Sequence, residues 1–299
     1  MADAVAETRT DERNASPWRA VGIFLLLTIC LTGVFWALII ATQTAYATYI
    51  YGAMWMPAVS ALLTCRILRR PFGTLGLGRW PWGYVLLGYL IPIVYCLVGS
   101  LGTWSFGFGG FPNVKFVHQV AEAFGLTGAP DWLVIVIFVL LQGTVGMMTS
   151  VAAATGEEIG WRGFQVPELA RVLPFTGVAL VSGLIWAFWH YPITPVVYRS
   201  VGVPAWFWLP TFTFAAVAIS FAQAWLRLKT GSVWPPIFLH ASHNLWMQSI
   251  FCPFTTQNEM TKWVAGDLGL AFMIVSAVVA LIFWAKRNEL PGGADKVIY

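Results

Sequence analysis

Three short clusters of polar residues interrupt an otherwise apolar chain of 299 residues, and their side chains could take up and release protons. The first cluster contains Glu157, Glu158 and Arg162. In a helix, Glu158 and Arg162 are four residues apart and can pair on one face, whereas Glu157 points about 100° away from Glu158. One carboxylate can therefore be held by the arginine while the other faces a cavity. Taken alone, a salt bridge at the end of a helix is the simpler interpretation.

The second and third clusters supply imidazole and carboxamide groups. His190 follows Trp186 by four residues, and a histidine among aromatic residues is more often a packed core residue than a functional one. His240 and Asn244 are also four residues apart, and His243 leans toward the same face of a helix. Hydrogen bonds between helices, worth about 1 kcal/mol each, are the simpler explanation of this third cluster.

Together the clusters contain the groups needed to hydrolyse an amide bond. A carboxylate or an imidazole can take a proton from water, and a carboxamide or an imidazole can donate to the oxyanion that develops. The same groups could bind a divalent metal ion, because Glu157, His190 and His240 would leave one coordination position for water. These residues alone leave the metal-free and the zinc mechanism open. The fourth histidine, His118, falls in a predicted loop and receives no role.

The composition indicates whether the segments around these clusters face water or lipid. Hydrophobic residues make up 58% of the chain and charged residues 10%, against about 25% charged residues in a typical soluble domain. The mean hydropathy is +0.72, and the 17 tryptophans suit positions at the level of lipid headgroups. Charged groups inside a bilayer are costly, so polar clusters within apolar segments become candidate functional sites. The chain is therefore predicted to be an integral membrane protein.

Eight segments are long and apolar enough to cross a bilayer as helices, which takes about 20 residues each. They lie at residues 19–42, 46–65, 82–103, 132–155, 174–195, 205–226, 233–251 and 264–285. Basic residues support this count, because 14 of the 17 fall in cytoplasmic segments when the N-terminus is inside, leaving 3 outside. The predicted fold class is an all-α polytopic membrane helix bundle of about eight transmembrane helices, with both termini cytoplasmic.

The chain is divided into three parts on this basis. Residues 1–16 are predicted to form a disordered cytoplasmic tail, 17–287 the eight-helix membrane domain, and 288–299 a second cytoplasmic tail. The polar clusters lie within the membrane domain, between residues 155 and 245. The basic residues are scattered between apolar segments and form no patch, which argues against a nucleic-acid partner.

The three clusters resemble the motifs of the CPBP family, the CAAX protease and bacteriocin-processing family, which includes the type II CAAX prenyl endopeptidase. The family pattern is EExxxR, then FxxxH, then HxxxN, spread over a bundle of typically eight helices. The first and third motifs are complete here, while Trp186 stands where phenylalanine is usual. The resemblance implies that Glu157 activates a water molecule with help from His190, and that His240 and Asn244 stabilise the oxyanion.

The predicted function is an intramembrane endopeptidase that cleaves a membrane-associated peptide, with Glu158, Arg162, Trp186 and His243 as supporting residues. Expected partners are membrane lipid and a peptide or lipidated peptide, and zinc is the candidate cofactor. The short basic loops suggest a bacterial plasma membrane, where a bacteriocin precursor or a signalling peptide is as reasonable a substrate as a prenylated protein. The alternatives are a catalytically silent membrane scaffold or immunity protein and, less favoured, a transporter.

Motifs of other intramembrane proteases are absent from the sequence. It contains no HExxH motif of zinc proteases and no GxSG step of serine proteases. Asp267 follows Ala265 and Gly266, which falls short of the GxGD motif of aspartate proteases, and it lies at the outer end of the last predicted span.

Overall fold

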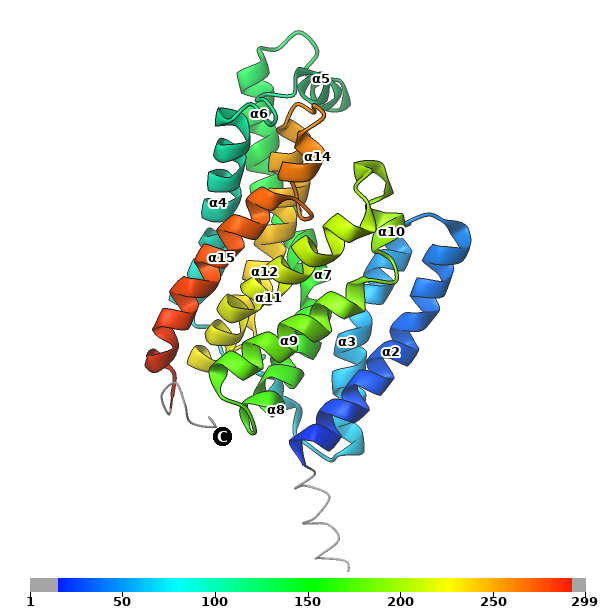
Figure 1. Ribbon diagram of the computed structural model, residues 1–299, viewed down its shortest axis with the longest axis vertical. Helices are drawn as coiled ribbons and strands as arrows, with labels where there is room; N and C mark the ends of the chain where they lie inside the picture. The colour runs from blue at the N-terminus through cyan, green and yellow to red at the C-terminus, as the bar shows by residue number, and fades with distance from the viewer. Residues whose placement is uncertain (1–15, 292–299) are drawn as a thin grey trace, which may run out of the picture.

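The computed structural model describes residues 16–291 and shows a bundle of tilted helices (Figure 1). In chain order, the elements are α2 (Pro17–Thr42), α3 (Ala47–Ile67), η1 (Phe72–Leu75), α4 (Trp82–Ser105), α5 (Val114–Ala123), α6 (Asp131–Leu141), η2 (Gln142–Gly146), α7 (Met147–Glu158), η3 (Ile159–Gln165), α8 (Val166–Ala170), α9 (Phe175–His190), α10 (Thr194–Val197), η4 (Arg199–Val201), α11 (Ala205–Thr230), α12 (Trp234–His243), η5 (Asn244–Phe251), α13 (Cys252–Phe254), α14 (Thr261–Val264), α15 (Leu270–Ala285) and η6 (Lys286–Glu289). Within the described residues, six helical segments are long and apolar enough to cross a membrane. The protein is an all-α membrane helix bundle, as the sequence predicts.

Each predicted span corresponds to a helix, but two of the eight lie outside the six long apolar segments. One is α9, which is apolar but only 16 residues long. The other is the column of α12, η5 and α13, which carries the third polar cluster. The number of membrane crossings and the side of the termini therefore stay predictions. Of the two predicted tails, 1–15 and 292–299 lie outside the described residues, whereas the second tail begins within η6.

The fourth span is longer than predicted, which changes the position of the first polar cluster. Its predicted range, 132–155, ends where the charged residues begin, whereas the helix continues without a break from Asp131 to Ala170. Glu157 and Glu158 therefore lie inside the helix and not at its end. Hydropathy marks this end too early because the charged residues face the interior of the bundle, where they need no lipid contact.

The longer helix also brings Glu157 and His190 to matching positions. Counted at about 1.5 Å per residue, Glu157 lies about 20 Å from the Ala170 end of its helix, and His190 about 22 Å from the Phe175 end of α9. A short link, residues 171–174, joins these two ends. With a helix that stops at residue 155, His190 would have lain too far along α9 to meet Glu157.

Close packing of α3 against α7 and η3 forms one wall of the bundle's interior. A Cβ atom on Gly156 would lie 2.7 Å from the Met54 carbonyl oxygen, and one on Gly160 would lie 2.5 Å from Pro57 Cβ. Small residues four positions apart let two membrane helices approach closely. The glycines on either side of the glutamate pair thus hold that pair against α3.

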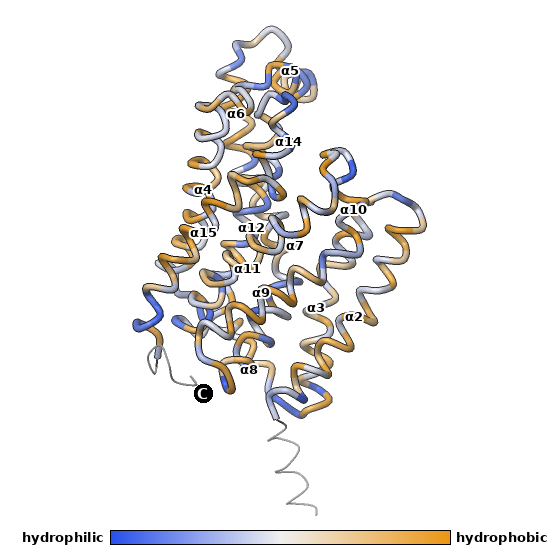
Figure 2. The backbone as a smooth tube through the Cα atoms, viewed as in Figure 1, coloured by the Kyte–Doolittle hydropathy of each residue, from blue (hydrophilic) through white to orange (hydrophobic). Residues whose placement is uncertain are grey.

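The remaining helices surround this wall. The strongest contacts join α11 to α9 and α15, α12 to α4, and α2 to α3. Figure 2 shows long hydrophobic stretches along the outer helices, with hydrophilic residues concentrated in the connections at the two ends. The surface stretch predicted at residues 114–124 is the helix α5, which lies at one end of the molecule beside the start of α6 (Figure 1).

Candidate active site

A buried ion pair between Glu158 and Arg162 anchors the site. Each side chain is at most 1% exposed, and Arg162 Nη1 donates to Glu158 Oε1 over 2.9 Å. The two residues are four apart, as the sequence predicts. Arg162 Nη2 donates to Ser220 Oγ over 3.1 Å and also to Gln223 Oε1, both on α11. Gln223 Nε2 completes the network by donating to Glu158 Oε1 over 3.3 Å. Removing one partner of such a pair leaves an uncompensated buried charge, so the network fixes α11 against η3.

Ser220 and Gln223 were not predicted from the sequence as site residues. The available signal was their helical spacing, three residues apart, in a span that is otherwise apolar at that depth. Polar side chains on one face of a membrane helix bind partners inside the bundle more often than they face lipid.

Glu157 points away from this ion pair and toward a cavity. Glu157 is buried, with 2% of its surface exposed, and its Oε2 accepts a hydrogen bond from Trp186 Nε1 over 2.8 Å. The cavity that it lines has a volume of about 170 Å³. The π-helical segment η3 begins two residues after Glu157, and such segments occur frequently at functional sites. The two adjacent carboxylates thus have separate surroundings.

The two motif histidines each have one ring nitrogen fixed by a hydrogen bond. His190 Nδ1 lies 2.8 Å from the Trp186 carbonyl oxygen, and His240 Nδ1 lies 2.8 Å from Glu158 Oε1. Carbonyl and carboxylate oxygens only accept, so Nδ1 carries the proton in both rings. Nε2 of each ring makes no hydrogen bond to a described residue, which leaves it available to the cavity.

Trp186 contacts both motif histidines, Arg162 and Glu157. Its ring meets His190 edge to face at 5.3 Å between centroids and His240 at 5.4 Å. Arg162 Cζ lies 4.7 Å from the same ring, and the indole N–H binds Glu157. Phenylalanine, the usual residue at this position of the motif, has no N–H, so tryptophan adds a hydrogen bond to the carboxylate.

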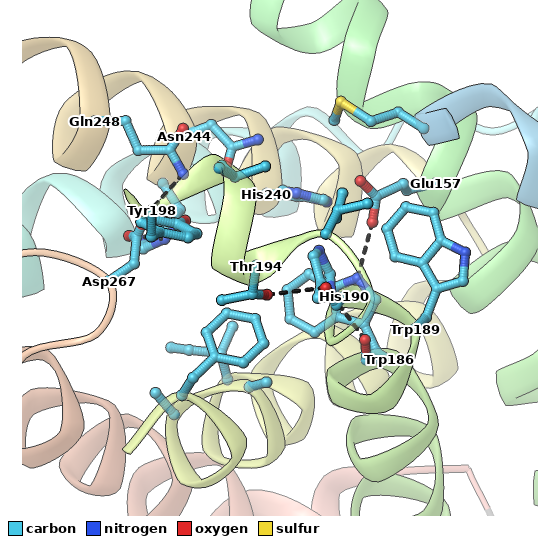
Figure 3. A pocket seen from close by; sticks show the side chains of 18 of the residues that line it. Glu157, Trp186, Trp189, His190, Thr194, Tyr198, His240, Asn244, Gln248 and Asp267 are labelled. Atoms are coloured by element: carbon cyan, nitrogen blue, oxygen red, sulfur yellow. Dashed lines mark hydrogen bonds and ion pairs between the residues drawn. The ribbon is translucent and has the colours of Figure 1, made fainter. Parts of the chain in front are cut away.

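The predicted site residues converge on one cavity. Glu157, His190, His240 and Asn244 all line it (Figure 3). His243 lines it as well. The Asn244 side chain makes no hydrogen bond to any residue between 16 and 291. Apolar side chains form most of the remaining wall: Ile50, Ala53, Trp189, Ile193, Val197, Phe212, Ala215, Ala216, Ile219, Leu239 and Phe272.

His243 belongs to a second polar group on the same cavity. Its Nδ1 lies 2.9 Å from the Tyr95 hydroxyl, and its Nε2 lies 3.1 Å from Asp267 Oδ1. Asp267 Oδ2 also accepts from the Tyr198 hydroxyl over 2.7 Å and from Gln248 Nε2 over 2.9 Å. In Figure 3 this group lies apart from Glu157 and His190. His243, predicted as a supporting residue, thus lines the same cavity and contacts Asp267 and Tyr95.

In the sequence, Asp267 stands out only as part of an incomplete aspartate-protease motif, and Tyr95, Tyr198 and Gln248 were not predicted as site residues. A tyrosine or glutamine near the end of an apolar span is common, so residue type alone gave no signal for these three. Asp267 could have been found, because it is an acidic residue at the edge of an apolar span and such residues usually face a partner.

The donor atoms left for a metal ion are of suitable types but are not gathered as a metal site. Nε2 of His190, Nε2 of His240 and one oxygen of Glu157 are chemically appropriate zinc ligands. Between residues 16 and 291, however, no three His, Cys, Asp or Glu side chains lie close enough together to hold a metal ion. This arrangement does not fit a three-ligand zinc centre, so the chemistry below is derived for the side chains and water.

Comparison with known proteins gives two matches. The family model described as "Type II CAAX prenyl endopeptidase Rce1-like" matches residues 128–246, which contain all three motifs. The protein named "CAAX prenyl protease 2" from Methanococcus maripaludis is 24% identical over 198 residues, which cover 63% of this chain and 64% of that protein. The chain thus spans slightly less than two thirds of this relative. The family-model match contains Glu157, His190, His240 and Asn244 of the cavity wall, and over this region the chain is similar to type II CAAX prenyl endopeptidases.

Proposed function

We propose that this protein is an intramembrane endopeptidase that hydrolyses a membrane-associated peptide with a water molecule activated by Glu157 and His190. The observation that carries the proposal is the convergence of Glu157, His190, His240 and Asn244, from three separate motifs, on one cavity. The Rce1-like match and the relative named CAAX prenyl protease 2 support a reaction of the CAAX-protease type.

Water activation falls to the two groups with free acceptor atoms. Glu157 Oε2 is held by the Trp186 indole, so Oε1 is the oxygen that can accept a proton from water. His190 has its Nδ1 proton on a carbonyl oxygen, so its Nε2 lone pair can orient or deprotonate the same water. The water oxygen attacks the peptide carbonyl carbon, and the proton taken by Glu157 passes to the leaving amide nitrogen as the C–N bond breaks.

The oxyanion is stabilised from the opposite side by Asn244 and His240. The Asn244 amide nitrogen has no partner among the described residues and can donate directly to the oxyanion. His240 can donate from Nε2 when the ring is protonated, since Nδ1 is held by Glu158. Glu157, Glu158 and Arg162 sum to one negative charge, so a proton on His240 makes the buried cluster neutral, and buried charges favour such pairing. In a largely apolar cavity these interactions are stronger than in water.

The same surroundings define the proposed substrate class and location. A cavity among membrane helices is accessible to a peptide that is itself held at the membrane, for example by a lipid attached to it. We propose membrane lipid and a peptide or lipidated peptide as partners, and a bacterial plasma membrane as the location.

The proposal is tested with purified protein in proteoliposomes and a fluorogenic farnesylated peptide that ends in a CAAX sequence. Glu157→Gln keeps the hydrogen-bond acceptor for Trp186 but not the base, and His240→Ala removes the oxyanion donor. Each should lower kcat by at least about 100-fold, the usual contribution of such groups. His118→Ala is the matched control, because its exposed side chain lies outside the cavity.

Native substrates follow from mass spectrometry of peptide C-termini in cells with the wild-type protein or Glu157→Gln. New C-termini should appear only with the wild type. Full activity of Glu157→Gln on the peptide would overturn the mechanism. Tight binding of the peptide by the wild type, without any cleavage, would favour the silent scaffold.

A further inference from the structure

A second cavity, of about 360 Å³, adjoins the active-site cavity and is lined by residues of α3, η2, α7 and η5. The two cavities share four lining residues, Ile50 and Met54 on α3, and Asn244 and Gln248 on η5. The boundary between the two cavities is therefore lined by two apolar side chains on α3 and by two carboxamides on η5. Asn244 and Gln248 are four residues apart in the π-helical segment η5, and Figure 3 shows both side chains beside the active-site cavity.

Gln248 is held in one orientation by Asp267. Its Nε2 donates to Asp267 Oδ2 over 2.9 Å. A carboxylate only accepts hydrogen bonds, so the amide nitrogen of Gln248 must face Asp267 and its carbonyl oxygen must face elsewhere. That oxygen makes no hydrogen bond within the described part of the chain, and the residue is exposed and lines both cavities. Gln248 thus presents a free acceptor.

Asp267 is itself immobilised, which makes this orientation rigid. The residue is 7% exposed, and it also binds the Tyr198 hydroxyl over 2.7 Å and His243 Nε2 over 3.1 Å. Three hydrogen bonds from three different segments leave the carboxylate little freedom to turn. A group whose orientation is fixed by its neighbours binds a ligand with a smaller loss of conformational freedom.

We propose that Gln248 and Asn244 bind the backbone of the peptide where it passes from the second cavity into the active-site cavity. The Gln248 oxygen accepts from a peptide N–H group, and Asn244 is placed one turn closer to the reacting carbonyl. An extended peptide needs such partners, because unsatisfied backbone groups are costly inside a membrane. Ile50 and Met54 face the opposite edge of the chain and favour small or apolar side chains at that position. This inference rests on the proposed endopeptidase function.

The experiment combines a change in the protein with a change in the peptide. Gln248→Met keeps the length of the side chain but removes the acceptor, and it should raise KM about tenfold with kcat changed less than about twofold, as expected for uniform binding. Asp267→Asn tests whether Asp267 orients Gln248. An asparagine amide can both donate and accept, so it can pair with either end of the Gln248 amide, and this variant should also raise KM. Gln119→Met, an exposed glutamine on α5 outside both cavities, is the control.

The matching peptides replace one backbone N–H at a time by an ester oxygen near the scissile bond. One ester position should bind the wild type about tenfold more weakly, and this penalty should vanish in Gln248→Met, as a double-mutant cycle requires for a direct contact. Binding is measured by fluorescence anisotropy in the Glu157→Gln background, so this readout does not depend on catalysis. Thermal unfolding of each variant confirms that it is folded.

The outcomes separate the two proposals. If cleavage depends on Glu157 but Gln248→Met leaves the ester penalty unchanged at every position, the backbone contact is overturned. The endopeptidase proposal then still holds. Binding that depends on Gln248 without any cleavage by the wild type supports the contact and overturns the endopeptidase.

Discussion

The indole nitrogen of Trp186 donates a hydrogen bond of 2.8 Å to Glu157 Oε2, at a motif position where the family usually has phenylalanine. This contact assigns different tasks to the two oxygens of the carboxylate, because one is held by the indole and the other is left for water. The same ring lies edge to face with His190 and His240. Tryptophan thus joins the proposed base to the two imidazoles, although the three residues are far apart in sequence.

Trp186→Phe should lower kcat about tenfold and leave KM nearly unchanged. The substitution removes a hydrogen bond to a charged group, worth about 1.5–3 kcal/mol, while the aromatic packing is largely kept. The measurement is steady-state kinetics on the fluorogenic peptide. Unaltered kcat in this variant would show that the indole packs against Glu157 without orienting it.

Arg162→Met should destabilise the protein by about 3–5 kcal/mol, because the buried carboxylates of Glu157 and Glu158 then lose the positive charge of Arg162. The change is measured as a fall in Tm or in the midpoint of unfolding in a mild detergent. Arg171→Met is the control: its side chain is 34% exposed and pairs with Glu168, so its loss should cost less than about 1 kcal/mol. Equal destabilisation by the two substitutions would contradict the anchoring role of the buried pair.

Gly156→Ala should lower both stability and activity, since the new methyl group would meet the α3 backbone at 2.7 Å. Overpacking of this kind costs about 1–3 kcal/mol and would move the helix that carries Glu157. Gly102→Ala provides the comparison within a helix, because nothing lies within 4 Å of a Cβ atom there. A wild-type Tm and kcat for Gly156→Ala would mean that α3 and α7 separate freely.

Activity should persist when zinc chelators are added to the purified protein. The free donors of Glu157, His190 and His240 are not gathered into a group that could hold a metal ion in the described chain. The test combines metal analysis of the purified protein with activity before and after 1,10-phenanthroline. One equivalent of bound zinc, with activity lost on its removal and regained on its return, would decide for the metal mechanism.

The sequence by itself determined that the chain lies in a bilayer, that its fold is all-α, and which residues pair within one helix. A bilayer requires long apolar helices with internally satisfied backbones, so composition and span length led directly to an all-α membrane bundle. Helical geometry is equally local, and it correctly placed Arg162 beside Glu158 and turned Glu157 away from both. Such inferences succeed because the relevant residues lie within one or two turns of one another.

Only the tertiary structure decided which distant residues meet. Hydropathy cannot separate a helix face that contacts lipid from one that faces the bundle, so the helix that carries Glu157 appeared to stop at residue 155 and not at Ala170. Spacing along one helix likewise suggested that His243 would join His240, whereas Asp267 and Tyr95 draw it to a different part of the cavity. These contacts depend on how helices from separate parts of the chain pack together, and no local pattern in the sequence encodes that packing.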